Sequence, residues 1–214
     1  MRHWARDVLL TRRGLIACAA GLVVAKAVPA GMTPTPDQTA GPFYPHTKPD
    51  DTDADLTQVE GASARASGEI IEVSGRILSV KGHALPGAVV EIWQADMNGR
   101  YFDPRDWSLR TSRDRNFQGY GAVRAGADGV YRFRTVRPSP YGTGFNRRTP
   151  HIHFRVVDGR LGELVTQMYF PGEPLNAQDV IYSSLSGDVS RNAATARLRP
   201  GDGASRFAYD LVLA

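Results

Sequence analysis

Short runs in which apolar and polar residues alternate recur from residue 69 to the end of the chain. The clearest run is 130–136, Val-Tyr-Arg-Phe-Arg-Thr-Val, whose alternation gives a strand one apolar face. Gly, Pro, Asp and Asn separate such runs, and no long stretch shows the period of an amphipathic helix. The pattern predicts an all-β fold, a β-sandwich of mostly antiparallel strands with long site-forming loops. The expected strands cover 69–80, 88–93, 130–136, 151–157, 164–170 and 207–213.

Two segments lack this alternation. Residues 31–66 are rich in Pro, Thr, Asp and Ala, and we interpret them as an irregular N-terminal arm that precedes a β-sandwich domain over 67–214. Residues 98–118 form a long loop with Tyr, Trp, Phe and many charges, and such loops on a rigid sheet commonly carry binding sites. The turn residues Asp128 and Gly129 favour a β-hairpin before the run at 130.

The first 30 residues have the features of an export signal. Arg12 and Arg13 precede a short, mostly apolar run, and small residues around 25–30 could form a cleavage site. Paired arginines before such a run are typical of a twin-arginine signal. The apolar run is shorter than the ~20 residues of a membrane span, so we expect no stable membrane insertion after processing. We therefore expect export by the twin-arginine route, to the periplasm or the medium.

The charge of the chain changes meaning once this segment is set apart. The formal net charge is +4, which by itself suggests an anionic partner such as nucleic acid. Five of the 26 basic residues and one of the 22 acidic residues lie within 1–30, so the remainder has 21 of each. Nucleic-acid binding thus loses its compositional support. The single cysteine, Cys18, excludes an internal disulfide framework and a cysteine-rich metal site.

The candidate chemistry begins with two histidines in a strand-like run. His151 and His153 are two residues apart, so both rings project from the same face of a strand and can reach one metal ion. The spacing alone does not identify the remaining ligands. They could be a carboxylate, another histidine (His46 or His83), or tyrosine, whose phenolate suits ferric iron. Two tyrosines lie at loop positions, Tyr101 and Tyr141.

Several segments resemble the intradiol ring-cleavage dioxygenases. The segments 90–101, 133–141 and 148–154 resemble the first tyrosine region, the second tyrosine region and the paired-histidine region of that family. Segment 33–45 resembles the N-terminal part of its protocatechuate branch, and 164–170 resembles a further strand. The five motifs occur in the family's order, which is far more specific than any one of them.

The resemblance implies a ligand set for one non-haem Fe(III). Its ligands would be Tyr101, Tyr141, His151 and His153. Arg148 corresponds to the family's arginine beside the substrate ring, so Arg148 and Tyr141 are the expected catalytic residues. Trp93 and Gln167 correspond to residues that line the pocket or lie near the metal. The short interval between Tyr141 and His151 departs from many relatives and leaves the substrate range open.

The implied reaction uses O₂ to cleave a catechol-type ring between its two hydroxylated carbons, giving a cis,cis-muconate-type diacid. The resemblance also implies either a homo-oligomer or pairing with a homologous chain. Two other functions stay open on the residues alone. One is a secreted, non-catalytic β-sandwich binding module, and the other is a Zn or Fe(II) enzyme that uses the histidine pair and a carboxylate.

Overall fold

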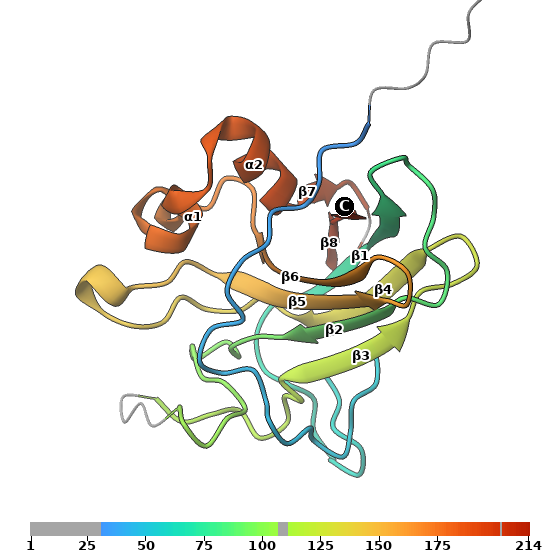
Figure 1. Ribbon diagram of the computed structural model, residues 1–214. Coiled ribbons are helices and arrows are strands. Elements are labelled where there is room, and N and C mark those ends of the chain that lie inside the picture. The colour runs from blue at the N-terminus through green and yellow to red at the C-terminus, as the bar shows by residue number, and fades with distance from the viewer. Residues whose placement is uncertain (1–30, 107–110, 202) are drawn as a thin grey trace, which may run out of the picture.

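The computed structural model describes residues 31–106, 111–201 and 203–214. The expected export signal at 1–30 lies outside the described residues. Within them, two β-sheets face one another (Figure 1). The predicted all-β sandwich is confirmed, and its apolar core lies between the sheets.

The first sheet has the strand order β4-β1-β8-β7, and β9 also pairs with β1. β1 pairs antiparallel with β4 and parallel with both β8 and β9. The alternation that predicted β4 is visible in its burial, since Tyr131 and Phe133 are buried whereas Arg132 and Arg134 are exposed. The strands are β1 (Ile70–Ser79), β4 (Val130–Val136), β7 (Arg197–Arg199), β8 (Ser205–Ala208) and β9 (Leu211–Leu213).

The second sheet has the order β3-β2-β5-β6, with every neighbouring pair antiparallel. Its inner face contributes fully buried residues such as Ile92, Ile152 and Phe154 to the core. The strands are β2 (Val89–Trp93), β3 (Tyr120–Arg124), β5 (His151–Asp158) and β6 (Gly162–Tyr169).

Four short helices complete the described part of the chain. The 3₁₀ helix η1 (Gly144–Asn146) lies in the connection between β4 and β5. After β6 come η2 (Pro174–Gln178), α1 (Val180–Ser184) and α2 (Gly187–Ala194), and α2 packs against β6 (Figure 1). Within the described ranges, none of the helices has the length and apolar character needed to cross a membrane.

The expected final strand at 207–213 was wrong, because the structure has two strands there. Tyr209 separates β8 from β9, and its carbonyl oxygen accepts the Tyr131 hydroxyl at 2.6 Å. The chain passes so close to β1 that a Cβ on Gly75 would lie 1.8 Å from that same oxygen. The close passage of Tyr209 over Gly75 interrupts the pairing of this segment with β1 and divides it into β8 and β9.

Two further differences concern strands that the sequence pattern missed or misplaced. β3 was not predicted, since Tyr-Gly-Ala-Val-Arg is short and has a glycine at its second position. The expected hairpin at Asp128 and Gly129 is a tight turn, but it joins β3 of one sheet to β4 of the other. β7 was also missed, because its three residues are all exposed and carry no buried face.

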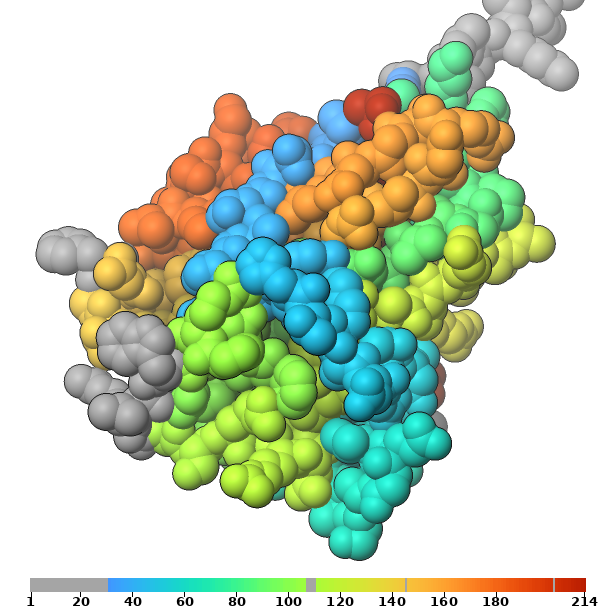
Figure 2. All heavy atoms as spheres, turned by 60° about the horizontal axis from the view of Figure 1, so that its bottom comes forward, coloured from blue at the N-terminus to red at the C-terminus, as the bar shows by residue number. Residues whose placement is uncertain are grey.

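Residues 31–66 contain no helix or strand but pack closely on the sandwich. The Gln38 amide donates to the carbonyl oxygen of Val165 at 2.7 Å, which places the chain along the edge strand β6. Leu56, farther along, is fully buried in the core. Figure 2 shows this segment crossing the surface beside β6 and continuing next to the loop that follows β2. The arm therefore covers one end of the second sheet, where the candidate site lies.

Candidate metal centre

Three neighbouring strands place a row of side chains at one end of the second sheet. Trp93 at the end of β2 pairs with His153 on β5, and His153 pairs with Gln167 on β6. Residues directly opposite one another in neighbouring strands share a face. His151 lies two residues before His153 and so projects from that same face.

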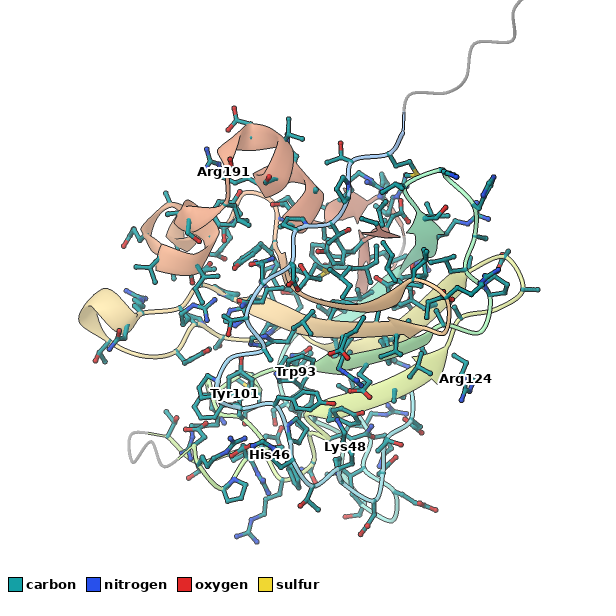
Figure 3. The ribbon with its side chains drawn as sticks, viewed as in Figure 1. His46, Lys48, Trp93, Tyr101, Arg124 and Arg191 are labelled. Carbon is teal, nitrogen blue, oxygen red and sulfur yellow. The ribbon has the colours of Figure 1, made fainter. Side chains whose placement is uncertain are left out.

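The two predicted tyrosines come to this row from separate loops. Tyr101 follows β2 and Tyr141 follows β4, and their rings lie edge to face with centroids 5.3 Å apart. The Tyr101 hydroxyl is 3.4 Å from His151 Nε2, which in turn is 3.2 Å from His153 Nε2. The Tyr141 and His151 ring centroids are 5.7 Å apart. All four predicted ligands are therefore brought together. Figure 3 shows Tyr101 and Trp93 close to each other at this end of the sheet.

The proton on His151 can be assigned from its environment. Its Nδ1 lies 2.6 Å from the carbonyl oxygen of Thr149. Because a carbonyl oxygen only accepts, Nδ1 carries the hydrogen and Nε2 of the neutral ring presents a lone pair. Burial, followed by the charge of Arg148, lowers the pKa of His151 to about 3, so the ring is neutral at neutral pH. A neutral imidazole with its other nitrogen hydrogen-bonded is the usual state of a metal ligand.

The His153 ring is fixed by stacking. Trp93 lies parallel to it, with centroids 4.8 Å apart and an interplanar angle of 9°. Burial and the neighbouring His151 lower the pKa of His153 well below its ordinary value. Within the described ranges, its Nδ1 is buried without a hydrogen-bond partner. Trp93 itself is buried and supports the imidazole from behind.

The buried carboxylate of Asp96 helps to organise the loop that carries Tyr101. The Asp96 carboxylate accepts the amides of Asn98 and Arg100 at 2.8 and 2.9 Å, and also that of Asp114. Its carbonyl oxygen accepts the amide of Ser139, which ties this loop to the one that carries Tyr141. Gly99, whose φ is 73°, lies so close to the loop that carries Tyr141 that a Cβ on it would be 2.9 Å from the carbonyl oxygen of Pro140. The two tyrosine loops therefore act as one packed unit.

Both tyrosines are protonated in the absence of a cation. Burial, followed by the proximity of Tyr141, raises the pKa of Tyr101 well above its ordinary value. Burial also raises the pKa of Tyr141, while the positive charge of Arg148 opposes that shift. A highly charged cation would reverse this by favouring both phenolates.

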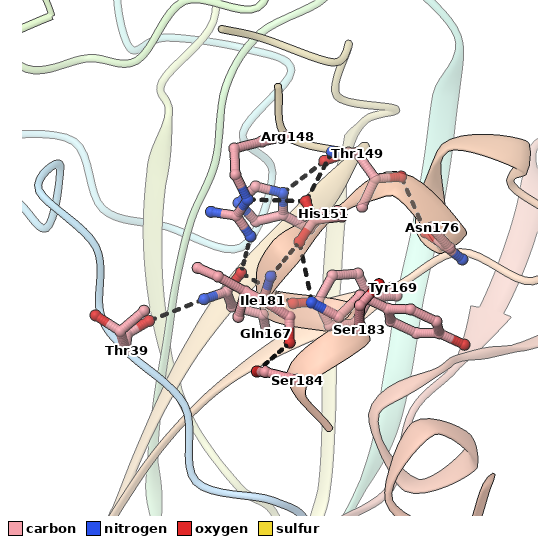
Figure 4. A network of polar contacts seen from close by, with 12 residues as sticks. Thr39, Arg148, Thr149, His151, Gln167, Tyr169, Asn176, Ile181, Ser183 and Ser184 are labelled. Carbon is pink, nitrogen blue, oxygen red and sulfur yellow. Dashed lines mark hydrogen bonds and ion pairs between the residues drawn. The ribbon is translucent and has the colours of Figure 1, made fainter. Parts of the chain in front are cut away.

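Arg148 joins the centre through its guanidinium. Its Nε donates to Asp179 Oδ2 at 2.8 Å, and Nη2 donates to Gln167 Oε1 at 2.6 Å. Gln167 Nε2 in turn donates to the carbonyl oxygen of Thr39 in the arm, as Figure 4 shows. The predicted arginine and glutamine thus belong to one network that also links the arm to β6.

Several residues at the site were not predicted. Phe43 of the arm packs on Tyr101 with ring centroids 4.7 Å apart, and a Cβ on Gly41 would lie 3.4 Å from His153 Cε1. Asp179 accepts a hydrogen bond from Arg148, and the carbonyl oxygen of Thr149 accepts one from His151. The resemblance of segment 33–45 to the family is a sequence signal for the arm residues Phe43 and Gly41. Asp179 had no such signal, because it lies in a polar stretch with no periodicity.

The alternative ligands do not gather here. His46 is exposed and accepts from Arg105 at 3.0 Å, and His83 is exposed in the turn after β1. Within the described residues, no group of three or more His, Cys, Asp and Glu side chains is placed to hold a metal ion. The donors near the histidine pair are therefore phenolic. Two phenolates are hard, anionic oxygen ligands and two neutral imidazoles are borderline nitrogen ligands that also suit iron, so this donor set fits a ferric ion.

Comparison with known proteins agrees with this geometry. A family model described as "Dioxygenase" matches residues 39–214. The protocatechuate 3,4-dioxygenase beta chain of Burkholderia cepacia is 42% identical over 137 residues, which cover 61% of this chain and 57% of that protein. The 6-chlorohydroxyquinol 1,2-dioxygenase of Cupriavidus pinatubonensis is 32% identical over 69% of this chain and 55% of that protein. The chain thus spans less than two thirds of the length of these relatives.

A solved structure covers the fold more completely. The dioxygenase domain of a dioxygenase and carbohydrate-binding protein fusion from Streptomyces sp. SirexAA-E superposes with a TM-score of 0.62 at 29% identity. The match covers 85% of this chain and 98% of that domain. The family match includes all four residues of the candidate centre and Arg148. The chain therefore belongs to the intradiol dioxygenase family.

Proposed function

We propose that this protein is an intradiol dioxygenase that cleaves a catechol-type ring between its two hydroxylated carbons, using O₂ and a non-haem Fe(III). One observation carries the proposal. His151 Nε2 lies 3.4 Å from the Tyr101 hydroxyl and 3.2 Å from His153 Nε2, and the Tyr141 ring packs against that of Tyr101. The product would be a cis,cis-muconate-type diacid.

Tyr101, Tyr141, His151 and His153 would hold the iron. Two phenolates and a solvent hydroxide balance three positive charges, so the resting centre would be close to neutral in its buried setting. The chemistry that Fe(III) would supply when bound by these four side chains is activation of a catecholate toward O₂. The remaining chemistry falls to the protein's side chains.

Tyr141 is the residue best placed to move a proton. A catechol must lose two hydroxyl protons to bind as a dianion, and a phenolate oxygen can accept one of them. Burial raises the pKa of Tyr141, which favours retention of the proton at its phenolic oxygen. Its ring meets those of Phe43 and Tyr101, and the positive charge of Arg148 opposes the effect of burial on its phenolic oxygen.

Arg148 supplies a fixed positive charge. Its guanidinium is held by Asp179 and Gln167, so it needs little reorganisation when negative charge develops on the substrate. The aromatic rings of Phe43, Tyr101 and Trp93 exclude water from the same region. These two features favour attack of O₂ on an electron-rich ring over side reactions with solvent.

The substrate class, partners and location are part of the proposal. The relatives are named for protocatechuate and chlorohydroxyquinol, which are catechol-type compounds. A homo-oligomer or a homologous partner chain is expected by the same analogy, since one relative is named as a beta chain. We also propose export by the twin-arginine route, on the paired residues Arg12 and Arg13.

Iron analysis combined with oxygen uptake on a panel of catechols tests the function. We expect about one iron per chain, one O₂ consumed per ring cleaved, and a diacid product by mass spectrometry. The variant His153→Ala should lose iron and activity together, whereas His83→Ala, in an exposed turn, should keep both. A semialdehyde product, or a zinc-loaded and inactive protein, would contradict the proposal.

A further inference from the structure

One buried carboxylate connects the helical segment after β6 to the candidate centre. Asp179 has no exposed surface. Its Oδ2 accepts Arg148 Nε at 2.8 Å and the backbone amide of Thr149 at 2.9 Å. Its Oδ1 accepts the amides of Ile181 and Tyr182 at 2.9 and 3.0 Å. Four N–H donors thus meet on one side chain, and Figure 4 labels three of the residues that supply them, Arg148, Thr149 and Ile181.

These four contacts serve two separate elements. The contacts of Oδ1 cap the N-terminus of α1, which is the ordinary role of an aspartate at that position. Oδ2 instead accepts hydrogen bonds from the Arg148 side chain and the Thr149 backbone, which lie just before β5 and more than 25 residues away in sequence. Because α1 holds Oδ1, the direction of Oδ2 is set, and with it the point to which Arg148 Nε is fixed.

The second contact of Arg148 completes its orientation. Nη2 donates to Gln167 Oε1 at 2.6 Å, so two different nitrogens of a planar group are held by two different elements. A planar group held at two points has its plane defined. Arg148 pairs with Tyr141 in an isolated β-bridge, and Gln167, which holds Nη2, lies opposite His153, so the guanidinium lies beside the predicted ligands.

The same carboxylate also bears on a predicted metal ligand. Thr149, whose amide Asp179 accepts, offers its carbonyl oxygen to His151 Nδ1 at 2.6 Å. Its hydroxyl donates to Asn176 Oδ1 at 2.9 Å, a second tie to the helical segment. Displacement of Thr149 would therefore turn the imidazole whose Nε2 faces the centre.

From these contacts we infer that Asp179 is a positioning residue, which fixes the Arg148 guanidinium beside the candidate centre and steadies His151 through Thr149. The inference rests on the proposed function for its catalytic consequence. Asp179 itself has no contact with the predicted iron ligands among the hydrogen bonds of the described residues, so it acts through Arg148 and Thr149. Loss of such a supporting residue commonly costs 10–100-fold in activity or metal affinity, as an order of magnitude.

Glu173 provides a matched control within the same segment. Its carboxylate caps η2 by accepting the Leu175 amide, and it pairs with Arg137 at 3.2 Å. It is therefore a second helix-capping acid that binds a distant arginine, but Arg137 packs on Phe170 rather than at the centre. Glu173→Gln removes the charge of a capping side chain and its ion pair without touching the site.

The first experiment measures position without turnover. In the metal-free protein, the Nε–H resonance of Arg148 in a ¹⁵N spectrum should be sharp and slow to exchange. Asp179→Asn should broaden it or make it exchange at least ~10-fold faster, whereas Glu173→Gln should leave it unchanged. Equal behaviour of wild type and Asp179→Asn would overturn the inference.

The second experiment is a double-mutant cycle on the iron-loaded protein. Asp179→Asn should lower kcat/KM by roughly 10–100-fold with Arg148 present, and by a clearly smaller factor in the Arg148→Gln background, where only the path through Thr149 to His151 remains. Equal losses in the two backgrounds would overturn the inference. If Asp179→Asn does not fold, Arg148→Lys tests the same contact, since lysine keeps the charge but cannot hold both partners. We expect a loss of at least ~10-fold there too, and full activity of Arg148→Lys would overturn the inference.

Failure of the inference and failure of the function are distinguishable. A wild-type protein without dioxygenase activity would contradict the proposed function, while the Arg148 resonance would still report whether Asp179 holds the guanidinium. An active wild type with an unaffected Asp179→Asn variant would contradict only the positioning role.

Discussion

Tyr141 and Arg148 are joined by two backbone hydrogen bonds. The Arg148 amide donates to the Tyr141 carbonyl oxygen at 2.8 Å, and the Tyr141 amide donates to the Arg148 carbonyl oxygen at 3.3 Å. The segment between them, with η1, projects away as an exposed loop. A predicted ligand and the predicted cation are thus held next to each other by the backbone.

The fixed charge of Arg148 gives the first prediction. Arg148→Gln should lower kcat/KM by roughly 100-fold or more, because a preorganised donor aimed at developing charge contributes about 3 kcal/mol. Steady-state oxygen uptake measures this. The control is Arg137→Gln, which breaks the ion pair between Arg137 and the helix-capping Glu173. Its kcat/KM should stay within about 3-fold of wild type. Similar losses in both variants would show that the effect is structural.

The buried histidines predict how the metal-free protein responds to acid. Both have a lowered pKa in the folded state, about 3 for His151, whereas the ordinary value is 6.5. Between those values the unfolded chain binds more protons, so the stability is present above pH 6.5 and is lost as the pH falls. Each histidine should reduce the free energy of unfolding by about 1.4 kcal/mol per pH unit below that point.

Denaturant unfolding of the metal-free protein from pH 7.5 to 5 checks this slope. The double variant His151→Asn and His153→Asn removes both titrating groups and should show a much flatter dependence. An unchanged slope in that variant would mean that other groups cause the acid sensitivity.

The arm gives a third prediction through Gly41. Its φ is 68°, and a Cβ there would lie 3.4 Å from His153 Cε1. Gly61 has φ of 77° and open space within 4 Å. Alanine at either position should cost about 1–2 kcal/mol of stability from backbone strain. Only Gly41→Ala should also weaken iron retention against a chelator, and equal retention in the two variants would show that the arm does not bear on the centre.

The sequence was informative where side-chain patterns repeat or where chemistry is specific. Val130–Val136 alternates and forms β4 with those bounds, and the two-residue spacing of His151 and His153 places both rings on one face of β5. The grouping of Tyr101 and Tyr141 with this pair was expected only from the resemblance. Residue spacing alone gave no distance between loops that are 40 residues apart in sequence.

The supporting residues could not be predicted for a related reason. Asp179 lies in a stretch whose role depends on the fold, since its partners Arg148 and Thr149 approach it from another strand connection. The break between β8 and β9 depends on the close passage of Tyr209 over Gly75, which no local pattern of residues 207–213 encodes.

The visible absorption spectrum of the purified, iron-loaded protein tests the central claim most directly. A phenolate bound to ferric iron absorbs visible light by charge transfer, so we predict a coloured protein whose band shifts and weakens in Tyr101→Phe and in Tyr141→Phe, because each variant keeps one phenolate. Tyr131 belongs to the first sheet, whereas the histidine ligands belong to the second. Tyr131→Phe removes a buried hydroxyl bond to Tyr209 and should cost about 1 kcal/mol of stability while leaving the colour unchanged. A colourless protein that binds zinc, or a band that is unchanged in both site variants, would contradict the assignment of Tyr101 and Tyr141 as iron ligands.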